Sequence, residues 1–416
     1  MRPLLFSTYD RIGGAARAAY RLHRGLREIG LDSHLLVQRK ITDDPTVHGP
    51  DGRLAKLAAL ARPSVDSLPL LRYPGRSDGL FSPAVLPDAL ARRVASMGGD
   101  LVHLHWVAGG FLRPESLAKL RLPIVWTLHD SWAFTGGCHV PGECVRYRDA
   151  CGACPALGSR RARDLSSSLL ERKRTAWARA SITLVTPSRW LADAARSSSA
   201  FRGARVEVIP NGLDLARFKP FDRSAARDFL GLPRDRSILL FGGVGSLGDP
   251  NKGFSLLVEA LGRVRSGARA PALELVVVGL SEPKAPPALP VPVRYTGPLG
   301  DEESMALYHA AADALVLPSR QENHPSMVIE AMACGTPTVA FRAAGLPGLV
   351  EHERTGYLAE PYESEDLARG ITWILEDEAR RRHAGDEARR RAERDHGLQA
   401  VARRYAALYE GVIAGK

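Results

Sequence analysis

The sequence predicts an α/β protein with two doubly wound domains, each built on a parallel sheet between layers of helices. Three observations support this prediction. Short apolar runs alternate with longer segments of helical periodicity along the whole chain. Several of these runs, such as 273–278, are continuously apolar, which is typical of strands covered on both faces. A chain of 416 residues, 45% of them hydrophobic, is also long enough to bury two cores.

Apolar or β-branched runs predict the strands in order. In the first half of the chain they lie at 3–7, 33–37, 101–106, 124–128, 183–186 and 206–209. In the second half they lie at 238–242, 273–278, 293–296, 314–317 and 338–341. Helical periodicity predicts helices that include 15–29, 254–265, 301–311, 326–333 and 363–376. The alternation of strand and helix therefore occurs twice, as two separate doubly wound domains require.

Pro210-Asn211-Gly212 separates the two patterns. We therefore predict an N-terminal domain at 1–210 and a C-terminal domain at 211–395. Residues 396–416 contain an amphipathic pattern at 398–413. We expect this last helix to pack back on the N-terminal domain, because its apolar face needs a partner.

Two segments are predicted to be irregular. The first, 49–87, is rich in Pro, Ser and Arg and has no clear period, so we expect a long surface excursion. The second is the Pro-rich stretch 283–292, which we expect to form a loop.

Composition restricts the partner and the compartment. Lys and Arg number 57 against 46 Asp and Glu, and the net charge of +11 favours nucleic acid, a phospholipid surface or a phosphorylated ligand. No apolar run approaches the roughly 18 residues of a membrane span, and the N-terminus lacks a secretory core, so we expect a cytoplasmic protein. Arginine runs at 380–382 and 389–394 alternate with acidic residues. They predict a solvated helix face, with peripheral contact to an anionic membrane as the alternative.

Two glycine-containing loops after predicted strands have the pattern of anion sites. Gly13-Gly14 precedes a helix, so backbone N–H groups and the helix N-terminus could face a phosphate. In the second half, Lys252 and Gly253 follow the glycine loop 242–245 and precede another helix, where the lysine would supply a mobile positive charge. This loop is not a Walker A sequence, because Gly253 stands where Ser or Thr would be needed. The alternatives are a simple tight turn and a solvated lysine.

Two carboxylates follow the predicted strand 314–317. Glu322 is expected in the loop after the strand, and Glu330 within the next helix. Ionised carboxylates accept hydrogen bonds well from the vicinal hydroxyls of sugars and riboses. Because 327–333 is otherwise almost wholly apolar, Glu330 is expected to be buried with a partner, and not to be an ordinary surface residue.

In these features the chain resembles the family 4 (group 1) retaining glycosyltransferases of GT-B architecture, in which two Rossmann-like domains face a central cleft. The resemblance covers essentially the whole chain and is strongest over 205–360, where the order and spacing of the motifs agree. The matching residues there are Pro210, Asn211, Gly212, Leu213, Asp214, Lys252, Gly253, Thr296, Gly297, Tyr308, Ala312, Asp313, Pro318, Ser319, Glu322, Glu330, Ala331, Cys334, Gly335, Thr336, Pro337, Gly345 and Gly356. In the first half, Gly13-Gly14, His105-Trp106 and 127–130 resemble an exopolysaccharide or colanic-acid-type subgroup.

The resemblance implies roles for the matching residues. Glu322 would bind donor-sugar hydroxyls, Glu330 the ribose of the nucleotide, and Lys252 the diphosphate. His129, at the end of an N-domain strand, would line the donor sugar, and Gly13-Gly14 would lie near the diphosphate and the acceptor. His129, Lys252 and Glu322 form the predicted catalytic set. Further donor contacts are expected from Ser246, Pro298, Leu299, Arg320, Asn323, His324 and Ser326.

The chain departs from the family pattern at two places. The family often places an arginine shortly before the lysine, whereas this loop offers Ser246, so Arg320 or another cation must compensate. The usual Gly-Phe-Gly after the first glutamate is Asn323-His324-Pro325, and Pro325 has no N–H to donate. These departures leave the identity of the donor open.

The chemistry that the resemblance implies is hexosyl transfer with retention, from a nucleotide-sugar donor to a saccharide or lipid-linked acceptor. Cations and N–H dipoles would stabilise the diphosphate leaving group. The chain contains no Asp-x-Asp pair, so we expect catalysis without a divalent ion. The family mechanism is front-face substitution, in which the donor phosphate helps to deprotonate the acceptor, and the domains should close on the donor to exclude water.

Four of the five cysteines, Cys138, Cys144, Cys151 and Cys154, fall within the loop 138–154. The last two form a Cys-Gly-Ala-Cys knuckle that suits a tetrahedral ion, so a structural zinc site is predicted. Two disulfides and four free thiols are the alternatives. His139 could replace one thiolate.

The remaining histidines and cysteine give weaker indications. Cys334 lies in an apolar helix and is expected in the core. His103 and His105 flank a strand end, where a core role and a ligand contact are both open.

Two other functions compete with sugar transfer. A nucleic-acid-binding protein with a four-cysteine zinc site would explain the charge, but the basic residues are scattered and no recognition signature is present, so we expect no nucleic-acid partner. A sugar-nucleotide epimerase on the same architecture is the second alternative. The spacing of Glu322 and Glu330 favours transfer.

Overall fold

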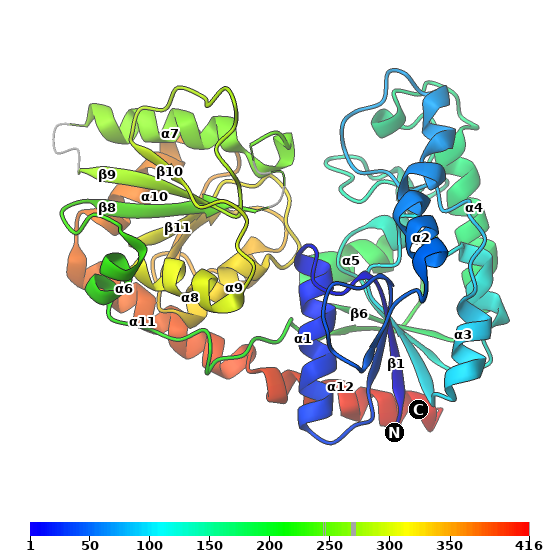
Figure 1. Ribbon diagram of the computed structural model, residues 1–416. Helices are drawn as coiled ribbons and strands as arrows, with labels where there is room; N and C mark the ends of the chain where they lie inside the picture. Colours follow the sequence, from blue (N-terminus) through cyan, green and yellow to red (C-terminus); the bar gives the residue numbers. More distant parts are fainter. Residues whose placement is uncertain (244, 246, 268–271, 416) are drawn as a thin grey trace. The chain divides into compact units, whose positions relative to one another are not determined.

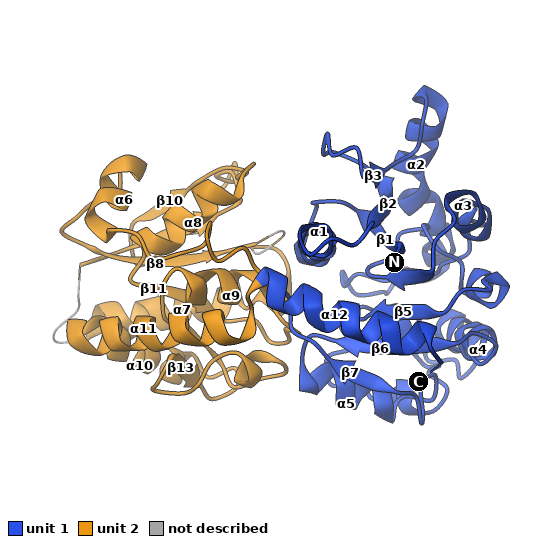
Figure 2. Ribbon diagram, turned by 90° about the horizontal axis from the view of Figure 1, so that it is seen from below, with its two compact units in different colours: residues 1–212, 398–416 blue, residues 213–397 orange. Residues whose placement is uncertain are grey.

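The computed structural model describes residues 1–243, 245, 247–267 and 272–415. They divide into two compact units, Met1–Gly212 with Leu398–Lys416 (unit 1) and Leu213–Gly397 (unit 2), shown in Figure 2. The boundaries thus fall at 212 and 397, where the sequence indicated 210 and 395.

Unit 1 is built on a seven-stranded parallel sheet in the order β3-β2-β1-β4-β5-β6-β7 (Figure 1). Its strands are β1 (Pro3–Tyr9), β2 (His34–Arg39), β3 (Val47–His48), β4 (Leu101–Leu104), β5 (Ile124–Thr127), β6 (Ile182–Thr186) and β7 (Val206–Val208). Its helices are α1 (Gly14–Glu28), α2 (Arg53–Asp66), α3 (Leu90–Met97), α4 (Leu165–Trp177), α5 (Arg189–Ser197) and α12 (Leu398–Ile413).

Unit 2 carries a six-stranded parallel sheet in the order β10-β9-β8-β11-β12-β13. Its strands are β8 (Ser237–Gly242), β9 (Leu273–Val278), β10 (Val293–Tyr295), β11 (Ala314–Leu317), β12 (Thr338–Phe341) and β13 (Gly356–Ala359). Its helices are α6 (Arg223–Leu230), α7 (Phe254–Ser266), α8 (Glu302–Ala311), α9 (Ser326–Ala333), α10 (Ser364–Leu375) and α11 (Glu378–Asp395). The predicted fold class, two doubly wound α/β domains, is confirmed.

Both sheets are buried on both faces, which explains their continuous apolar runs. In β1, Leu4 and Phe6 pack into one core cluster while Leu5 packs into another on the opposite face. In β8, Leu240 and Phe241 are likewise divided between two clusters. A strand in this position needs apolar side chains at every residue and not only at alternate ones.

Polar side chains begin several helices of unit 2. The carboxylates of Asp222, Asp301 and Asp377 each accept a hydrogen bond from the backbone N–H three residues later, at the starts of α6, α8 and α11. Such caps satisfy N–H groups that the first turn leaves unpaired. The helices therefore start where the sequence provides an aspartate.

The strand order reverses once in each sheet, between β1 and β4 in unit 1 and between β8 and β11 in unit 2. Loops leave the carboxyl ends of these strands in opposite directions, and doubly wound folds bind ligands at such points. Gly13-Gly14 follows β1, Lys252 follows β8 and Glu322 follows β11. The topology thus brings the predicted site residues of each unit to its switch point.

The last helix, α12, belongs to unit 1 as predicted. It packs along α1, where Gly25 leaves room for Leu398, since an added Cβ would lie 3.0 Å from the Leu398 side chain. Its buried face includes Val401, Tyr405 and Tyr409.

Several sequence predictions were incomplete. The segment 49–87 was expected to be an irregular excursion, but it contains α2 and the 3-10 helix Leu68–Arg72. The alanines and leucines of α2 are distributed around the whole helix, so its sequence shows no contrast between a polar and an apolar face. The short edge strands β3 and β13 were also missed, because a few residues give too little periodicity.

The arginine runs lie on α11, as expected for a helix, but they are not wholly solvated. Arg389 donates to the carbonyls of Phe218 and Ala333 at 2.8 and 2.7 Å, and Arg391 pairs with Glu351 at 3.0 Å. These side chains fasten α11 to the rest of unit 2. Within the described residues, no helix is both long enough and apolar enough to cross a membrane.

Candidate functional site

A charged pair joins two loops at the carboxyl edge of the unit 2 sheet. Lys252 Nζ lies 2.6 Å from Glu322 Oε1, and the two side chains are 25% and 15% exposed. Because β8 and β11 are neighbouring parallel strands, their following loops lie side by side. Burial disfavours the ammonium, but the Glu322 carboxylate raises the pKa of Lys252 above its ordinary value, so the group stays charged. The lysine predicted as a mobile charge is held in an ion pair.

Asn251 fixes the geometry of this pair. Its side-chain amide donates to the Gln321 carbonyl at 2.9 Å and accepts from the Gln321 N–H at 3.0 Å, while the Arg320 N–H donates to the Asn251 carbonyl at 2.7 Å. The Asn251 side chain thus bonds to both backbone groups of Gln321, as a neighbouring strand would, and connects the loop after β11 to the loop after β8. Sequence reasoning missed Asn251, although its place directly before Lys252 was the available indication.

Two glycines allow these loops to approach their neighbours. Gly253 has φ +66°, and a Cβ there would lie 1.9 Å from the Pro318 carbonyl oxygen. A Cβ on Gly345 would lie 1.8 Å from the Asn323 carbonyl oxygen, and the Gly345 N–H donates to the Glu322 carbonyl at 2.8 Å. Both positions therefore require glycine, and both hold the segment that carries Glu322.

Glu330 lies fully buried in α9, as expected. His309 of α8 is its partner, with Nε2 3.7 Å from Glu330 Oε2, and both side chains are 0% exposed. The Thr336 hydroxyl donates to the His309 carbonyl at 2.6 Å and so ties the end of α8 to the segment after α9. The partner was missed because α8 and α9 are brought together only by the tertiary fold. A ligand ribose could reach this carboxylate only if neighbouring atoms moved.

The other predicted donor contacts of unit 2 are distributed around this edge. The Arg320 guanidinium stacks on the ring of Tyr362 at 4.8 Å, and the Tyr362 hydroxyl donates to the Arg320 carbonyl at 3.3 Å. His324 is buried with its ring edge-on to His396 at 5.2 Å. The half-buried residues are Leu299, Asn323 and Ser326, whereas Pro298 is exposed. Ser246 lies outside the described residues.

Pro325 caps the N-terminus of α9 with backbone alone, at φ −65° and ψ 127°, and no side chain bonds to the first turn. This follows because the side chain of proline has no oxygen that could accept a hydrogen bond from these N–H groups. The N–H groups of the first turn of α9 are thus not occupied by a side-chain cap.

In unit 1, Gly13 begins α1 with φ +85°, and nothing lies within 4 Å of a Cβ added there. Neither a side-chain cap nor an acidic residue occupies the first turn of α1, and Gly14 is exposed. Asp10 fixes the preceding loop by accepting from the N–H groups of Ile41 and Thr42 at 2.7 and 2.8 Å. The loop therefore presents an open helix N-terminus, as an anion site requires.

The half-buried His129 begins a row of three histidines at the ends of β4 and β5, in which His105 and His103 are buried. His129 Nε2 and His105 Nδ1 share a hydrogen bond of 3.0 Å, and the rings of His105 and His103 lie 4.2 Å apart. His103 in turn bonds to the Tyr409 hydroxyl at 2.6 Å and to Thr127 Oγ1 at 2.8 Å. Burial lowers the pKa of His129 to about 4 and those of His103 and His105 well below their ordinary value. The row is therefore neutral near pH 7.

A second polar group surrounds Asp130. Its Oδ2 accepts from Trp106 Nε1 at 2.7 Å and lies 2.7 Å from His139 Nδ1, while His139 Nε2 bonds to Ser82 Oγ at 2.9 Å. Burial opposes the charge of Asp130, but His139 and the hydrogen bonds lower the pKa of its carboxyl below the ordinary value. Both ring nitrogens of His139 are thus hydrogen-bonded to Asp130 and Ser82. The role of Asp130 was missed, although it follows His129 directly.

The four loop cysteines line one small cavity of about 20 Å³, together with Arg146 and Tyr147. All four are free thiols, and among the described side chains no three His, Cys, Asp or Glu are arranged so that they could hold a metal ion. The zinc site therefore stays a prediction from the sequence. Lys173 of α4 lies fully buried nearby, with Nζ donating to the carbonyls of Trp132 and Thr135. Cys334 is buried in the core of unit 2, as expected.

Two family models match consecutive parts of the chain. The model described as Glycosyltransferase Family 4 matches residues 12–217, and the model described as Glycosyl transferases group 1 matches residues 222–391.

Curated relatives match about half of the chain. The D-inositol 3-phosphate glycosyltransferase 2 of Catenulispora acidiphila is 35% identical over 223 residues, which cover 50% of this chain and 51% of the relative. The D-inositol 3-phosphate glycosyltransferase of Mycobacteroides abscessus is 36% identical over 183 residues, which cover 41% of this chain and 39% of the relative. The chain thus spans about half of the length of the first relative and 39% of the length of the second.

Solved structures share the whole fold at low identity. Sucrose-phosphate synthase from Thermosynechococcus elongatus superposes with a TM-score of 0.73 at 22% identity, covering 100% of both chains. The Anabaena protein HepE in complex with UDP-glucose superposes with a TM-score of 0.64 at 19% identity, covering 99% of this chain and 100% of that one.

Proposed function

The chain belongs to the group 1, family 4-like glycosyltransferases of GT-B architecture, and on this premise we propose that it transfers a hexose from a nucleotide-diphosphate donor to a saccharide or lipid-linked acceptor, with retention. The Lys252–Glu322 pair carries the proposal, because it places a cation and a hydroxyl acceptor 2.6 Å apart at the switch point of unit 2. The Anabaena structure in complex with UDP-glucose supports a nucleotide-sugar donor.

In the proposed reaction each site residue has one task. Lys252 neutralises charge that develops on the diphosphate as the glycosidic bond breaks, and Glu322 accepts hydrogen bonds from the sugar. A diphosphate that takes Lys252 from Glu322 would at the same time free the carboxylate for the sugar hydroxyls. Glu330 orients the nucleotide ribose, and the open helix end at Gly13-Gly14 receives negative charge.

His129 has the properties of a neutral contact to the donor sugar. Its pKa of about 4 keeps the ring uncharged near pH 7, and the bond to His105 fixes its orientation. A neutral imidazole can accept or donate a hydrogen bond to a hydroxyl without adding charge. No divalent ion takes part in the proposed mechanism.

For the acceptor we propose a growing surface glycan, as the resemblance of residues 127–130 to the exopolysaccharide subgroup suggests. The names of the curated relatives support a different acceptor, an inositol phosphate. Assays with both acceptor classes decide between them, and the anomeric configuration of the product, read by NMR, tests retention.

A thermal-shift panel of nucleoside diphosphates and nucleotide sugars tests the donor. A ligand at a hundred times its Kd adds about 2.7 kcal/mol of stability. We expect one base class to raise the melting temperature, and Glu322→Gln and Glu330→Gln to reduce the rise. Glu365→Gln, whose side chain is 67% exposed, is the matched control and should keep it. If no nucleotide shifts the melting temperature, the proposed function is wrong.

A further inference from the structure

Large apolar side chains of unit 1 are exposed along α2 and the 3-10 helix that follows it. The exposed fractions are 83% for Leu54, 62% for Leu57, 52% for Leu60, 56% for Leu68 and 75% for Leu71. We call these five side chains the leucine face. Single exposed leucines are ordinary, but a group on consecutive elements marks an interaction surface.

The packing of α2 is the reverse of that of an ordinary surface helix. The side that faces unit 1 carries Ala55, Ala58 and Ala59, which line an apolar cavity of about 320 Å³, while the leucines face outward. A helix that serves only its own domain turns its largest apolar residues to the core. Among all residues of α2, only Asp66 is buried.

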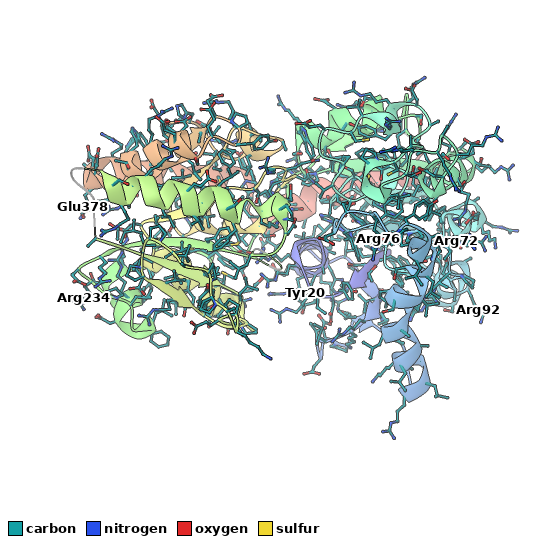
Figure 3. The ribbon with its side chains drawn as sticks, turned by 90° about the horizontal axis from the view of Figure 1, so that it is seen from above. Tyr20, Arg72, Arg76, Arg92, Arg234 and Glu378 are labelled. Atoms are coloured by element: carbon teal, nitrogen blue, oxygen red, sulfur yellow. The ribbon has the colours of Figure 1, made fainter. Side chains whose placement is uncertain are left out.

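The helix is nevertheless held firmly at its C-terminal end. The Asp66 carboxylate accepts from the N–H groups of Ala84 and Val85 at 3.1 and 2.8 Å. Arg62 donates to the carbonyls of Gly110 and Pro87 at 2.7 and 2.5 Å. In Figures 2 and 3 the other end of α2 projects clear of the rest of unit 1.

The segment 53–76, which carries the leucine face, is basic at its surface, and the exposed Asp51 and Asp78 lie just beyond its two ends. Within 53–76 the only acidic residue is the buried Asp66, whereas Arg53, Lys56, Arg72 and Arg76 are exposed. None of these four forms an ion pair with any residue that the structure describes.

We propose that the leucine face, with these four basic residues, docks on the surface of an anionic lipid membrane. Leucines that enter the boundary between headgroups and acyl chains, next to cations that contact phosphates, are the chemistry of an interfacial helix. A protein partner of mixed charge would not need four unpaired cations around an apolar centre. The proposal concerns binding only and does not depend on the transferase activity.

This surface differs from the one that the sequence suggested. The arginine runs of α11 are occupied by ion pairs, such as Arg382 with Glu378 at 2.5 Å and Arg389 with Glu393 at 2.7 Å. Paired guanidinium groups have less to gain from lipid phosphates than unpaired ones. The membrane contact is therefore assigned to unit 1.

Sedimentation of the full chain with lipid vesicles tests the proposal. We expect binding to phosphatidylcholine vesicles that contain about one third phosphatidylglycerol, and at least tenfold weaker binding to pure phosphatidylcholine.

Two double variants separate the apolar and the charged contribution. Leu54→Gln with Leu57→Gln should weaken binding to the anionic vesicles at least tenfold. Arg53→Gln with Lys56→Gln should remove most of the salt dependence of this binding. The matched apolar control is Phe229→Gln on α6 of unit 2, a residue that is 79% exposed, and it should bind like the wild type.

Melting curves without lipid separate docking from folding, because all four substituted residues are exposed and the curves should coincide with the wild type. Equal binding of the wild type and the leucine variant, or absence of binding to anionic vesicles, overturns the proposal. Light scattering that shows a dimer broken by the leucine substitutions, without vesicle binding, would make the face a contact between copies and also overturns it.

Discussion

Lys252 and Glu322 form an ion pair of 2.6 Å in which each neutralises the charge of the other. Each side chain is mostly buried, so either charge alone would lack the attraction that offsets its desolvation cost. In the proposed reaction, a nucleotide diphosphate would replace Glu322 as the anionic partner of Lys252, so the ammonium would stay paired. Catalysis gains from such a group only if it interacts more strongly with the departing diphosphate than with the bound donor.

Replacing Lys252 by glutamine should therefore impair the chemical step. We expect kcat/KM for sugar transfer to fall about 100-fold to 1,000-fold, as for the loss of one preorganised electrostatic group. Steady-state kinetics with a saturating acceptor measures the effect. Lys219→Gln removes an exposed lysine of the same unit and should leave kcat/KM within about twofold. Equal losses in the two variants would contradict the role given to Lys252.

Gly253→Ala tests how closely the two loops must approach. The new Cβ would lie 1.9 Å from the Pro318 carbonyl oxygen, so the backbone must shift as well as tolerate φ +66°. Gly231, with φ +61° and nothing within 4 Å of an added Cβ, is the matched control. We expect Gly231→Ala to cost about 1 kcal/mol of unfolding free energy. Gly253→Ala should cost at least about 2 kcal/mol more, because the clash involves backbone on both sides. Urea denaturation measures both, and equal costs would contradict the steric argument.

Single residues could be predicted from the sequence where topology alone places them. Lys252 and Glu322 each follow an apolar strand, and parallel strands bring such loops to one edge. The His309 partner of Glu330 could not be predicted, because the packing of α8 on α9 decides which side chain faces the carboxylate. For the same reason Asp130 and His139, nine residues apart in an irregular loop, gave no periodic pattern.

At the level of elements, long buried strands and helices were the easiest to predict. The strands β9, β11 and β12 and the helices α9 and α12 have the bounds that their apolar patterns indicate. The failure at α2 has a physical cause, since its leucines are exposed and only Asp66 of the helix is buried. A helix whose apolar residues do not define a buried stripe cannot be recognised by a method that looks for one.

Whether the four cysteines of the loop 138–154 bind zinc can be decided by a direct measurement. Their thiols line one cavity of about 20 Å³, enough for a single water or ion. We expect one zinc per chain by elemental mass spectrometry of the reduced protein, as the knuckle spacing predicts. Cys151→Ser and Cys154→Ser should each lose the metal, and Cys334→Ser, in the core of unit 2, should keep it. Intact mass that shows two disulfides, or five reactive thiols without metal, would contradict the zinc prediction.

At the level of the whole molecule, the pH dependence of stability is expected to arise from the histidines of unit 1. Five histidines of unit 1 have pKa values below the ordinary 6.5: His23, His48, His103, His105 and His129. Of these, His23, His103 and His105 are buried. His23 bonds to Ser33 Oγ at 2.9 Å and to Thr46 Oγ1 at 2.8 Å. These rings fill buried space with hydrogen bonds but must stay neutral to do so.

The stability of unit 1 should therefore fall on mild acidification. A histidine with a pKa of about 4 in the folded chain and about 6.5 in the unfolded chain binds more protons when unfolded between these values. The contribution of such a histidine to the free energy of unfolding is complete above pH 6.5 and is lost as the pH falls toward 4, with a total for His23 of about 3 kcal/mol.

Urea unfolding followed by tryptophan fluorescence reports mainly on unit 1, because only Trp373 of the six tryptophans lies in unit 2. We expect the urea midpoint to drop between pH 7 and 4.5, with a shallower drop in His23→Gln. His383→Gln, which replaces an exposed histidine of α11, should keep the wild-type dependence. If the urea midpoints of the wild type and His23→Gln fall equally with pH, protonation of His23 does not cause the loss of stability.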